Sequence, residues 1–294
     1  MNAIRTPEYC FSNIPDYPFN PHYMHYKDLR VHYVDEGSEE PVVCLHGEPT
    51  WSYLYRHVIV NLSSKYRVVA PDFIGFGKSD KLVNSKDYSY HLHYHTIAAL
   101  IEQLQLTDIN LVVHDWGGLV GLGLLRDYAD HIKRLIIMNT FLPLGKRLPT
   151  QLQAWKFFAR LHPNLPVGTI MRLGSRYLRS GGKDIINAYK APFPSRKYKG
   201  GVYAFPRLLP QSTDNQIIPF MKSAYTILQN WAKPALVLFS NSDIVYKRQD
   251  QFFAELIPSV GIQDHITLNN AGHFLQEDKR EEIGILIRSF LQRT

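Results

Sequence analysis

The sequence has few cysteines, no low-complexity tract and no long apolar run. Its two cysteines, Cys10 and Cys44, are too few for a disulfide framework, and Cys44 lies in the apolar run 41–45, where a free thiol behaves as a small hydrophobic group. No apolar stretch is long enough to span a bilayer, and no repeat recurs at a solenoid spacing. The first residues also lack the apolar core of a secretory signal. We therefore expect a soluble, cytoplasmic protein with no membrane partner.

Motifs for phosphate and metal binding are missing as well. Gly75 and Gly77 do not have the spacing of a P-loop. A dinucleotide site would need a third glycine and a helix directly after it, and neither is present, so we expect a structural loop and no cofactor. His91, His93 and His95 open a helical stretch, and His91 and His95 would share one face of it. A zinc site needs a third ligand, and the neighbouring sequence offers no acid or cysteine. We interpret the three as surface histidines and predict no metal.

Positive charge is concentrated in one segment of a chain whose net charge is +7. Residues 172–207 contain nine lysines and arginines against one acid, Asp184. A basic face can bind nucleic acid, but the segment carries no nucleic-acid recognition motif. We therefore interpret it as a solvated helical surface and predict no nucleic-acid partner.

Short apolar runs alternate with helical patterns along most of the chain. Repeated β-α-β units with apolar strands predict an α/β fold with a mostly parallel, doubly wound sheet of about eight strands. Between 139 and 234 the strand signal stops, so we interpret 143–213 as a helical cap domain inserted after the sixth strand, and 1–142 with 214–294 as the core domain. The expected strands include 28–36, 41–45, 67–70, 110–113, 132–138, 235–239 and 265–268. The expected helices include 52–62, 90–106, 119–128, 151–161, 183–189 and 216–228.

Asp115 lies between the largely apolar run 110–113 and a helical stretch rich in small residues. An acid at a strand-to-helix turn occupies the place of the catalytic residue in the nucleophile elbow of α/β hydrolases. Val113 stands where that pattern has a small residue, so Gly117 alone would relieve the tight turn. An acid here also suits a helix N-terminus, where its oxygens accept backbone N–H bonds. Asp115 by itself leaves both interpretations open.

Two later strand ends supply partners for Asp115. A nucleophile elbow is followed along the chain by an acid and then by a histidine. Asp243 follows the run 235–239, and His273 follows the run 265–268. Alone, Asp243 suits a turn and His273 suits a loop after a glycine. Their occurrence in this order at strand ends favours a catalytic triad of Asp115, Asp243 and His273.

An aspartate in the nucleophile position restricts the chemistry. A serine attacking a saturated carbon would form an ether, whereas aspartate forms an alkyl ester whose carbonyl carbon water can attack. We predict displacement at saturated carbon by Asp115, with His273 as the base of the second step and Asp243 orienting it. The backbone N–H groups of Glu48 and Trp116 are expected to form the oxyanion hole, with the Glu48 carboxylate pointing away into a hydrogen-bond network.

The leaving group of the first step also needs a donor. An indole N–H donates without accepting and suits a soft anion in a dry pocket, and Trp116 is adjacent to the nucleophile. Trp155, in the helical run 151–161, is a second candidate. Its periodicity alone favours packing between cap and core.

Several motifs together resemble the haloalkane dehalogenases over nearly the whole chain: HGEPTWSYLYR, APDFIGFGKSD, VVHDWGG and AGHFLQE. HGEPTWSYLYR is the most specific, and HDWGG is shared with epoxide hydrolases. The resemblance is to the subgroup with two halide-binding tryptophans and an Asp-His-Asp triad. It implies an α/β-hydrolase fold, a covalent alkyl ester on Asp115, halide ligands Trp116 and Trp155, and conversion of a haloalkane and water to an alcohol, a halide ion and a proton.

Two alternatives stay open. An epoxide hydrolase would share the nucleophile and base but needs cap tyrosines to protonate the epoxide oxygen, for which Tyr177, Tyr189, Tyr198 and Tyr203 are available. A ligand-binding relative without turnover is the other, although no triad member is missing. We expect a monomer whose cap packs over the pocket. The expected pocket residues are Leu119, Leu152, Ile244, Val245 and Phe274.

Overall fold

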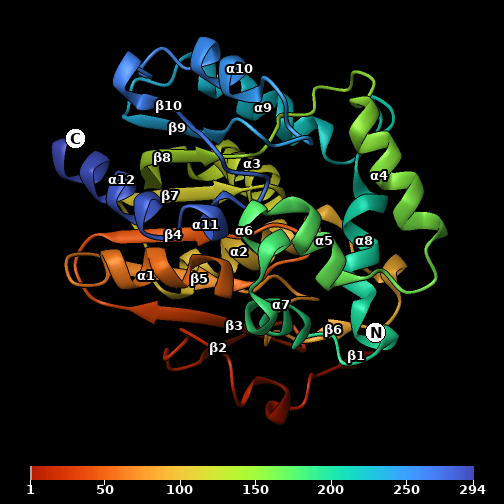
Figure 1. The fold of residues 1–294 in the computed structure, drawn as a ribbon. Coiled ribbons are helices and arrows are strands. Elements are labelled where there is room, and N and C mark those ends of the chain that lie inside the picture. The colour runs from red at the N-terminus through yellow and green to blue at the C-terminus, as the bar shows by residue number, and fades with distance from the viewer. Residues whose placement is uncertain (1) are drawn as a thin grey trace.

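An eight-stranded sheet forms the centre of the computed structural model, which describes residues 2–294 (Figure 1). The strand order is β10-β9-β8-β7-β4-β5-β3-β2, and β3 runs antiparallel to both its neighbours while the other pairs are parallel. The prediction of a mostly parallel sheet of about eight strands is confirmed. The strands are β2 His22–Tyr26, β3 Leu29–Glu36, β4 Pro41–Leu45, β5 Arg67–Pro71, β7 Ile109–His114, β8 Ile132–Met138, β9 Ala235–Ser240 and β10 His265–Leu268, and a separate antiparallel pair consists of β1 Ala3–Ile4 and β6 Lys81–Leu82.

Apolar side chains on both faces place the central strands inside the molecule. Every residue of β7 and β9 is buried, as expected for parallel strands covered by helices on both sides. In Figure 1, α1 and α12 lie in front of the sheet and α2 and α3 lie behind it. The helices outside the 143–213 segment are α1 Arg56–Leu62, α2 Tyr90–Gln103, α3 Trp116–Tyr128, α9 Ile218–Gln229, α10 Gln249–Leu256, α11 Leu275–Asp278 and α12 Arg280–Arg293. The short 3-10 helices are η1 Glu8–Phe11, η2 Ser52–Tyr55, η3 Ser85–Asp87, η4 Ala129–His131, η5 Arg196–Lys199 and η6 Ile262–Asp264.

Helices fill the segment 143–213, which lies between β8 and β9, and α4, α5 and α8 lie beyond one end of the sheet (Figure 1). Two of the helices in this segment were expected, and three more, α5, α6 and α8, were not. The segment contains α4 Thr150–Leu161, α5 Val167–Gly174, α6 Arg176–Ser180, α7 Lys183–Lys190 and α8 Gly200–Leu208. Along residues 2–294, no helix combines the length and the apolarity needed to cross a membrane.

The three histidines at the start of α2 differ in their surroundings. His93 is fully buried, with its ring centroid 5.5 Å from that of Phe73 and 4.7 Å from that of Phe205. Burial lowers the pKa of His93 to about 3, so it stays neutral. The expectation of a surface position is therefore wrong for His93, because it faces the core. Among residues 2–294, no group of three or more His, Cys, Asp or Glu side chains is arranged to hold a metal ion.

Candidate active site

Asp115 lies on the sharp turn between β7 and α3. Its backbone has φ +52° and ψ −122°, a conformation that a non-glycine residue rarely adopts and that is found at functional sites. A Cβ at Gly117 would lie 2.0 Å from the Leu45 carbonyl oxygen, so the turn can pass close to β4 only with glycine there. The predicted position of Asp115 on a strand-to-helix turn, with Gly117 relieving it, is confirmed.

The Asp115 carboxylate is held by groups from two other segments. The Glu48 backbone N–H donates a 2.8 Å hydrogen bond to Oδ1, and the Tyr246 hydroxyl donates a 2.7 Å bond to Oδ2. A Cβ at Gly47 would lie 2.2 Å from Asp115 Oδ1, so the missing side chain lets the Glu48 amide approach. The carboxylate makes no capping hydrogen bond to α3. Asp115 stands at the N-cap position of α3, but the alternative that its side-chain oxygens cap the helix is wrong.

The turns after β9 and β10 bring Asp243 and His273 to the same site. His273 Nε2 lies 3.7 Å from Asp115 Oδ2, and His273 Nδ1 lies 3.0 Å from Asp243 Oδ2. Because a carboxylate only accepts, Nδ1 carries the proton and Nε2 faces Asp115. The structure thus brings the three predicted residues together in an Asp-His-Asp arrangement.

Burial and charge set the protonation of this group in opposing directions. Burial lowers the pKa of His273, but the charges of Asp243 and Asp115 outweigh it and leave that pKa above the usual value. Burial likewise raises the pKa of Asp243, but His273 lowers it further and Asp243 stays ionised. The pKa of His273 therefore depends directly on whether Asp115 carries its charge.

Two buried residues hold the His273 backbone, and sequence reasoning missed both. His114 Nε2 and Asn139 Nδ2 each donate a 2.9 Å hydrogen bond to the His273 carbonyl oxygen. Burial, reinforced by the charge of His273, lowers the pKa of His114 to about 4 and keeps it neutral. Asn139 directly follows β8, so its place at a strand end was the signal that pointed to the site.

Tyr246 is the other residue that the sequence analysis missed. Its ring stacks on Phe141 at 5.2 Å between centroids and lies 5.5 Å from the His273 ring. Burial, with the Asp115 charge, raises the pKa of Tyr246 well above its usual value, so the phenol remains a donor. Its position three residues after Asp243, in the same strand-end loop, was an available signal.

A mostly apolar cavity of about 400 Å³ lies above Asp115, between the strand ends and helices α4 and α5. Leu152, Ile244, Val245 and Phe274 line it, as expected. The expectation is wrong for Leu119, which is fully buried in α3 and whose carbonyl accepts a 3.0 Å hydrogen bond from the Tyr90 hydroxyl. Its side chain lies in the core because α3 turns that face away from the cavity.

Both candidate indoles line the same cavity. Trp116 stacks on Phe205 at 4.5 Å between ring centroids, and Trp155 reaches the cavity from α4. The Glu48 side chain also lines it, and its buried Oε1 has no hydrogen-bond partner among the described residues. The expectation that this carboxyl points away into a network is therefore wrong. Burial and the Asp115 charge raise the pKa of Glu48 well above its usual value, while a hydrogen bond with the Trp155 side chain lowers it.

None of the four cap tyrosines lines this cavity. Tyr189 donates a 2.5 Å hydrogen bond to buried Glu277, and Tyr203 contacts the backbone of His162. Tyr177 lies on the surface, and the Arg280 guanidinium carbon lies 3.9 Å from the centroid of the Tyr177 ring. Tyr198 is only partly buried, against the edge of the core. The donors that an epoxide hydrolase would take from these tyrosines are absent from the cavity.

Known proteins are similar to this chain in sequence and fold. Residues 40–280 match the family described as alpha/beta hydrolase fold. A haloalkane dehalogenase of Mycolicibacterium paratuberculosis is 41% identical to this chain, over 99% of both chains. One of Psychrobacter cryohalolentis is 40% identical, over 99% of this chain and 98% of its own length. The tetrameric haloalkane dehalogenase DpaA from Paraglaciecola agarilytica NO2 superposes with a TM-score of 0.90 at 34% identity, over 97% of both chains. A cis-3-alkyl-4-alkyloxetan-2-one decarboxylase of Shewanella oneidensis is more distant, 30% identical over 94% of this chain and 90% of its own length. The chain belongs to the haloalkane dehalogenase family of α/β hydrolases.

Proposed function

We propose that this chain hydrolyses the carbon–halogen bond of haloalkanes through a covalent alkyl ester on Asp115. The observation that carries the proposal is the Asp115 carboxylate at the base of an apolar cavity, with Oδ1 on the Glu48 amide and Oδ2 3.7 Å from His273 Nε2. The reaction consumes a haloalkane and water and releases an alcohol, a halide ion and a proton.

In the first step, Asp115 Oδ2 attacks the halogen-bearing carbon. The carbon–halogen bond breaks with its electron pair on the halide, and the indole N–H groups of Trp116 and Trp155 hold that ion. Both indoles line the cavity that contains Asp115. Apolar walls exclude water, which strengthens these donors and leaves the carboxylate as the available nucleophile.

In the second step, His273 takes a proton from water, which attacks the carbonyl carbon of the ester. Forming the ester removes the Asp115 charge, which is one of the two charges that raise the pKa of His273. His273 therefore becomes more readily neutral at the stage that needs a base. The Glu48 amide, already on Oδ1, holds the oxyanion together with the Trp116 amide. The alcohol then leaves and Asp115 is regenerated.

Trapping the ester tests this mechanism. In His273→Phe, exposure to 1-bromobutane should add the mass of one butyl group at Asp115, with one bromide released per active site. The double variant Asp115→Asn/His273→Phe is the matched control and should gain no mass. An unmodified His273→Phe protein under saturating substrate would contradict the covalent mechanism and favour a ligand-binding relative.

Substrate comparison separates the alternative reactions. The wild-type protein should release bromide from 1,2-dibromoethane and leave styrene oxide unchanged, because the four cap tyrosines lie outside the cavity. A 3,4-dialkyl-oxetan-2-one is tested beside them, since a more distant relative decarboxylates that class. Turnover of the epoxide or the lactone without bromide release would overturn the dehalogenase proposal.

Loss of one indole tests the halide site. Trp155→Phe keeps an aromatic ring but removes the N–H, and bromide binding should weaken about 10- to 100-fold, since a hydrogen bond to a charged partner contributes roughly 1.5–3 kcal/mol. The matched control is Trp231→Phe. Trp231 lies outside the cavity, and its buried indole N–H has no hydrogen-bond partner among the described residues. Equal bromide affinity in the two variants would remove Trp155 from the proposed site.

The remaining parts of the proposal concern organisation. We propose that 143–213 acts as a cap domain over a core of 1–142 and 214–294, and that the protein is a cytoplasmic monomer. All the side chains of the proposed site come from one chain, so no partner is needed to complete it. DpaA is tetrameric, so light scattering after size exclusion tests whether this protein is a monomer. Fractionation of the producing cells tests its location.

A further inference from the structure

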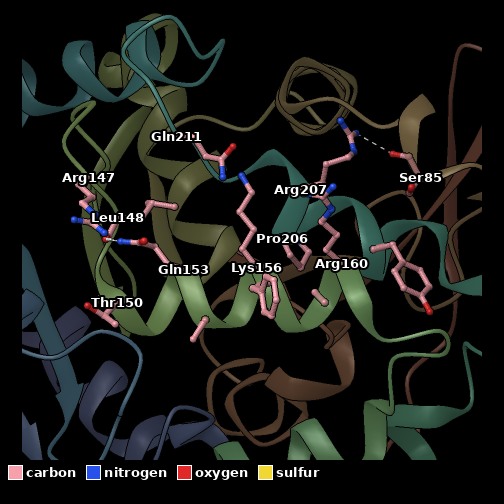
Figure 2. A pocket seen from close by; sticks show the side chains of 14 residues that line it. Ser85, Arg147, Leu148, Thr150, Gln153, Lys156, Arg160, Pro206, Arg207 and Gln211 are labelled. Atoms are coloured by element: carbon pink, nitrogen blue, oxygen red, sulfur yellow. Dashed lines mark hydrogen bonds between the residues drawn. The ribbon is translucent and has the colours of Figure 1, made fainter.

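A second cavity, of about 1120 Å³, lies between α4 and α8 (Figure 2). Its walls come from α4, from α8, from the loop before α4 and from Ser85 on η3. In Figure 2, Lys156 and Arg160 point from α4 toward the side where Arg207 and Gln211 lie, and Arg147 lies beside Leu148. The cavity contains none of the residues of the proposed reaction.

The charges that line this cavity have one sign. Arg147, Lys156, Arg160 and Arg207 line it, no carboxylate does, and within residues 2–294 none of the four forms a salt bridge. Lys156 and Arg207 donate to backbone carbonyls, Lys156 to Leu209 and Arg207 to Ser85 and Tyr88. Burial and then the charge of Arg207 lower the pKa of Lys156. The four cations therefore repel one another without compensation from the described residues.

The two remaining guanidinium groups are free for a ligand. Arg147 and Arg160 are exposed, and their side chains make no hydrogen bond to another described residue. An arginine presents a planar fork of donors that matches the oxygens of a phosphate. Lys156 and Arg207, already fixed by the backbone, would add charge at no further ordering cost.

The cationic surface continues beyond the cavity. A neighbouring hollow of about 700 Å³ shares Ser85, Arg160 and Tyr203 and adds Arg196 and Lys197. Its lining also contains no carboxylate. A ligand with several linked anionic groups can therefore contact cations in both hollows, whereas a single monovalent ion cannot.

Helix α4 connects this cavity to the catalytic one. Gln153, Lys156 and Arg160 face the cationic cavity, while Leu152 and Trp155 face the cavity above Asp115. Residues three and four apart share a helix face, so one helix presents a separate stripe to each cavity. A displacement of α4 toward α8 on ligand binding would also move Trp155, which lies on the same helix.

We propose that the cavity between α4 and α8 binds a compound with several linked phosphate groups, and that its occupancy changes halide binding through α4. The coupling rests on the proposed role of Trp155, whereas phosphate binding does not. The site is chemically distinct from the apolar catalytic cavity, so substrate and phosphate compound bind together.

Titration with inorganic tripolyphosphate tests the site. Isothermal calorimetry at constant ionic strength should show one site per chain, and Arg147→Gln/Arg160→Gln should weaken binding at least tenfold. Lys65→Gln/Lys222→Gln removes the same charge from exposed positions outside both cavities and should bind as the wild type does. Calorimetry needs no turnover, so this result stands whether or not the chain is a dehalogenase.

Three outcomes would overturn the proposed binding site, and a fourth would overturn the coupling. Equal weakening in the two double variants would show attraction to net charge alone. Absence of heat and of any protection from thermal unfolding would show that no site exists. A short single-stranded oligonucleotide that binds while tripolyphosphate does not would assign the surface to nucleic acid. In the fourth, tripolyphosphate binds while the bromide affinity, measured by tryptophan fluorescence, is the same in its presence and in its absence. That result would show that the coupling through α4 is wrong.

Discussion

The Tyr246 hydroxyl donates a 2.7 Å hydrogen bond to Oδ2 of Asp115, the oxygen that also faces His273. The other oxygen, Oδ1, is engaged by the Glu48 amide. The oxygen proposed to attack substrate is therefore the one that the phenol stabilises in the resting state. Attack requires this bond to lengthen or break, so Tyr246 lowers the reactivity of Asp115 before substrate arrives.

Removing the phenol should speed the first step. A hydrogen bond to a charged acceptor contributes roughly 1.5–3 kcal/mol, and each 1.4 kcal/mol changes a rate tenfold, so Tyr246→Phe should raise the single-turnover alkylation rate by about 10- to 100-fold. Rapid-quench mass spectrometry of the Asp115 ester measures it, with exposed Tyr177→Phe as the control. Slower alkylation in Tyr246→Phe would mean that the phenol assists attack.

Hydrolysis of the ester should depend on pH through His273. The base must be neutral, so the hydrolysis rate should rise as the pH increases through the pKa of His273. That pKa is raised in the free enzyme by Asp243 and Asp115, and the ester removes the Asp115 contribution. We expect the pKa from the hydrolysis rate to lie below the pKa of His273 that NMR measures in the free enzyme. Equal values would show that the Asp115 charge does not act on His273.

Glu48 should behave as a neutral carboxyl at neutral pH. Because its pKa is raised well above the usual value, Glu48→Gln should change bromide affinity less than about twofold at neutral pH. As the pH rises through that pKa, the wild-type carboxyl gains a charge in the cavity and should repel the halide, whereas the glutamine variant should not. Parallel pH profiles of the two proteins, measured by bromide titration, would refute this assignment.

The buried pair of Arg56 and Glu277 should contribute strongly to stability. Both side chains are fully buried, with Nη2 2.8 Å from Oε2, and the Tyr189 hydroxyl from α7 donates to the same carboxylate. Glu277→Gln leaves the arginine charge uncompensated and should lower the free energy of unfolding by ~3–5 kcal/mol. Tyr189→Phe removes only a hydrogen bond to the charged carboxylate and should cost ~1.5–3 kcal/mol. Urea denaturation measures both, and equal losses would contradict an ionic origin.

Local patterns predicted much of the fold. The bounds of β4, β8 and β10 match the predicted ranges. The run of β4 is apolar throughout, as expected for a strand covered on both faces, whereas β8 includes Lys133 and Arg134 and β10 is mostly only partly buried. Helices α5, α6 and α8 were not predicted, because their short, polar-interrupted patterns are stabilised by packing on neighbouring helices. The buried position of His93 was missed for the same reason, since its aromatic neighbours come from distant segments.

The sequence by itself determined that Asp115, Asp243 and His273 each follow a parallel strand, in that chain order. This was enough to predict that they meet, because the carboxyl ends of parallel strands lie at one edge of a sheet. Only the tertiary structure decided which way nearby side chains point. It placed Tyr246 on Asp115, turned the Glu48 carboxyl into the cavity, buried Leu119 and excluded four cap tyrosines. Those directions depend on how separate loops and helices pack over the strand ends, which no local pattern encodes.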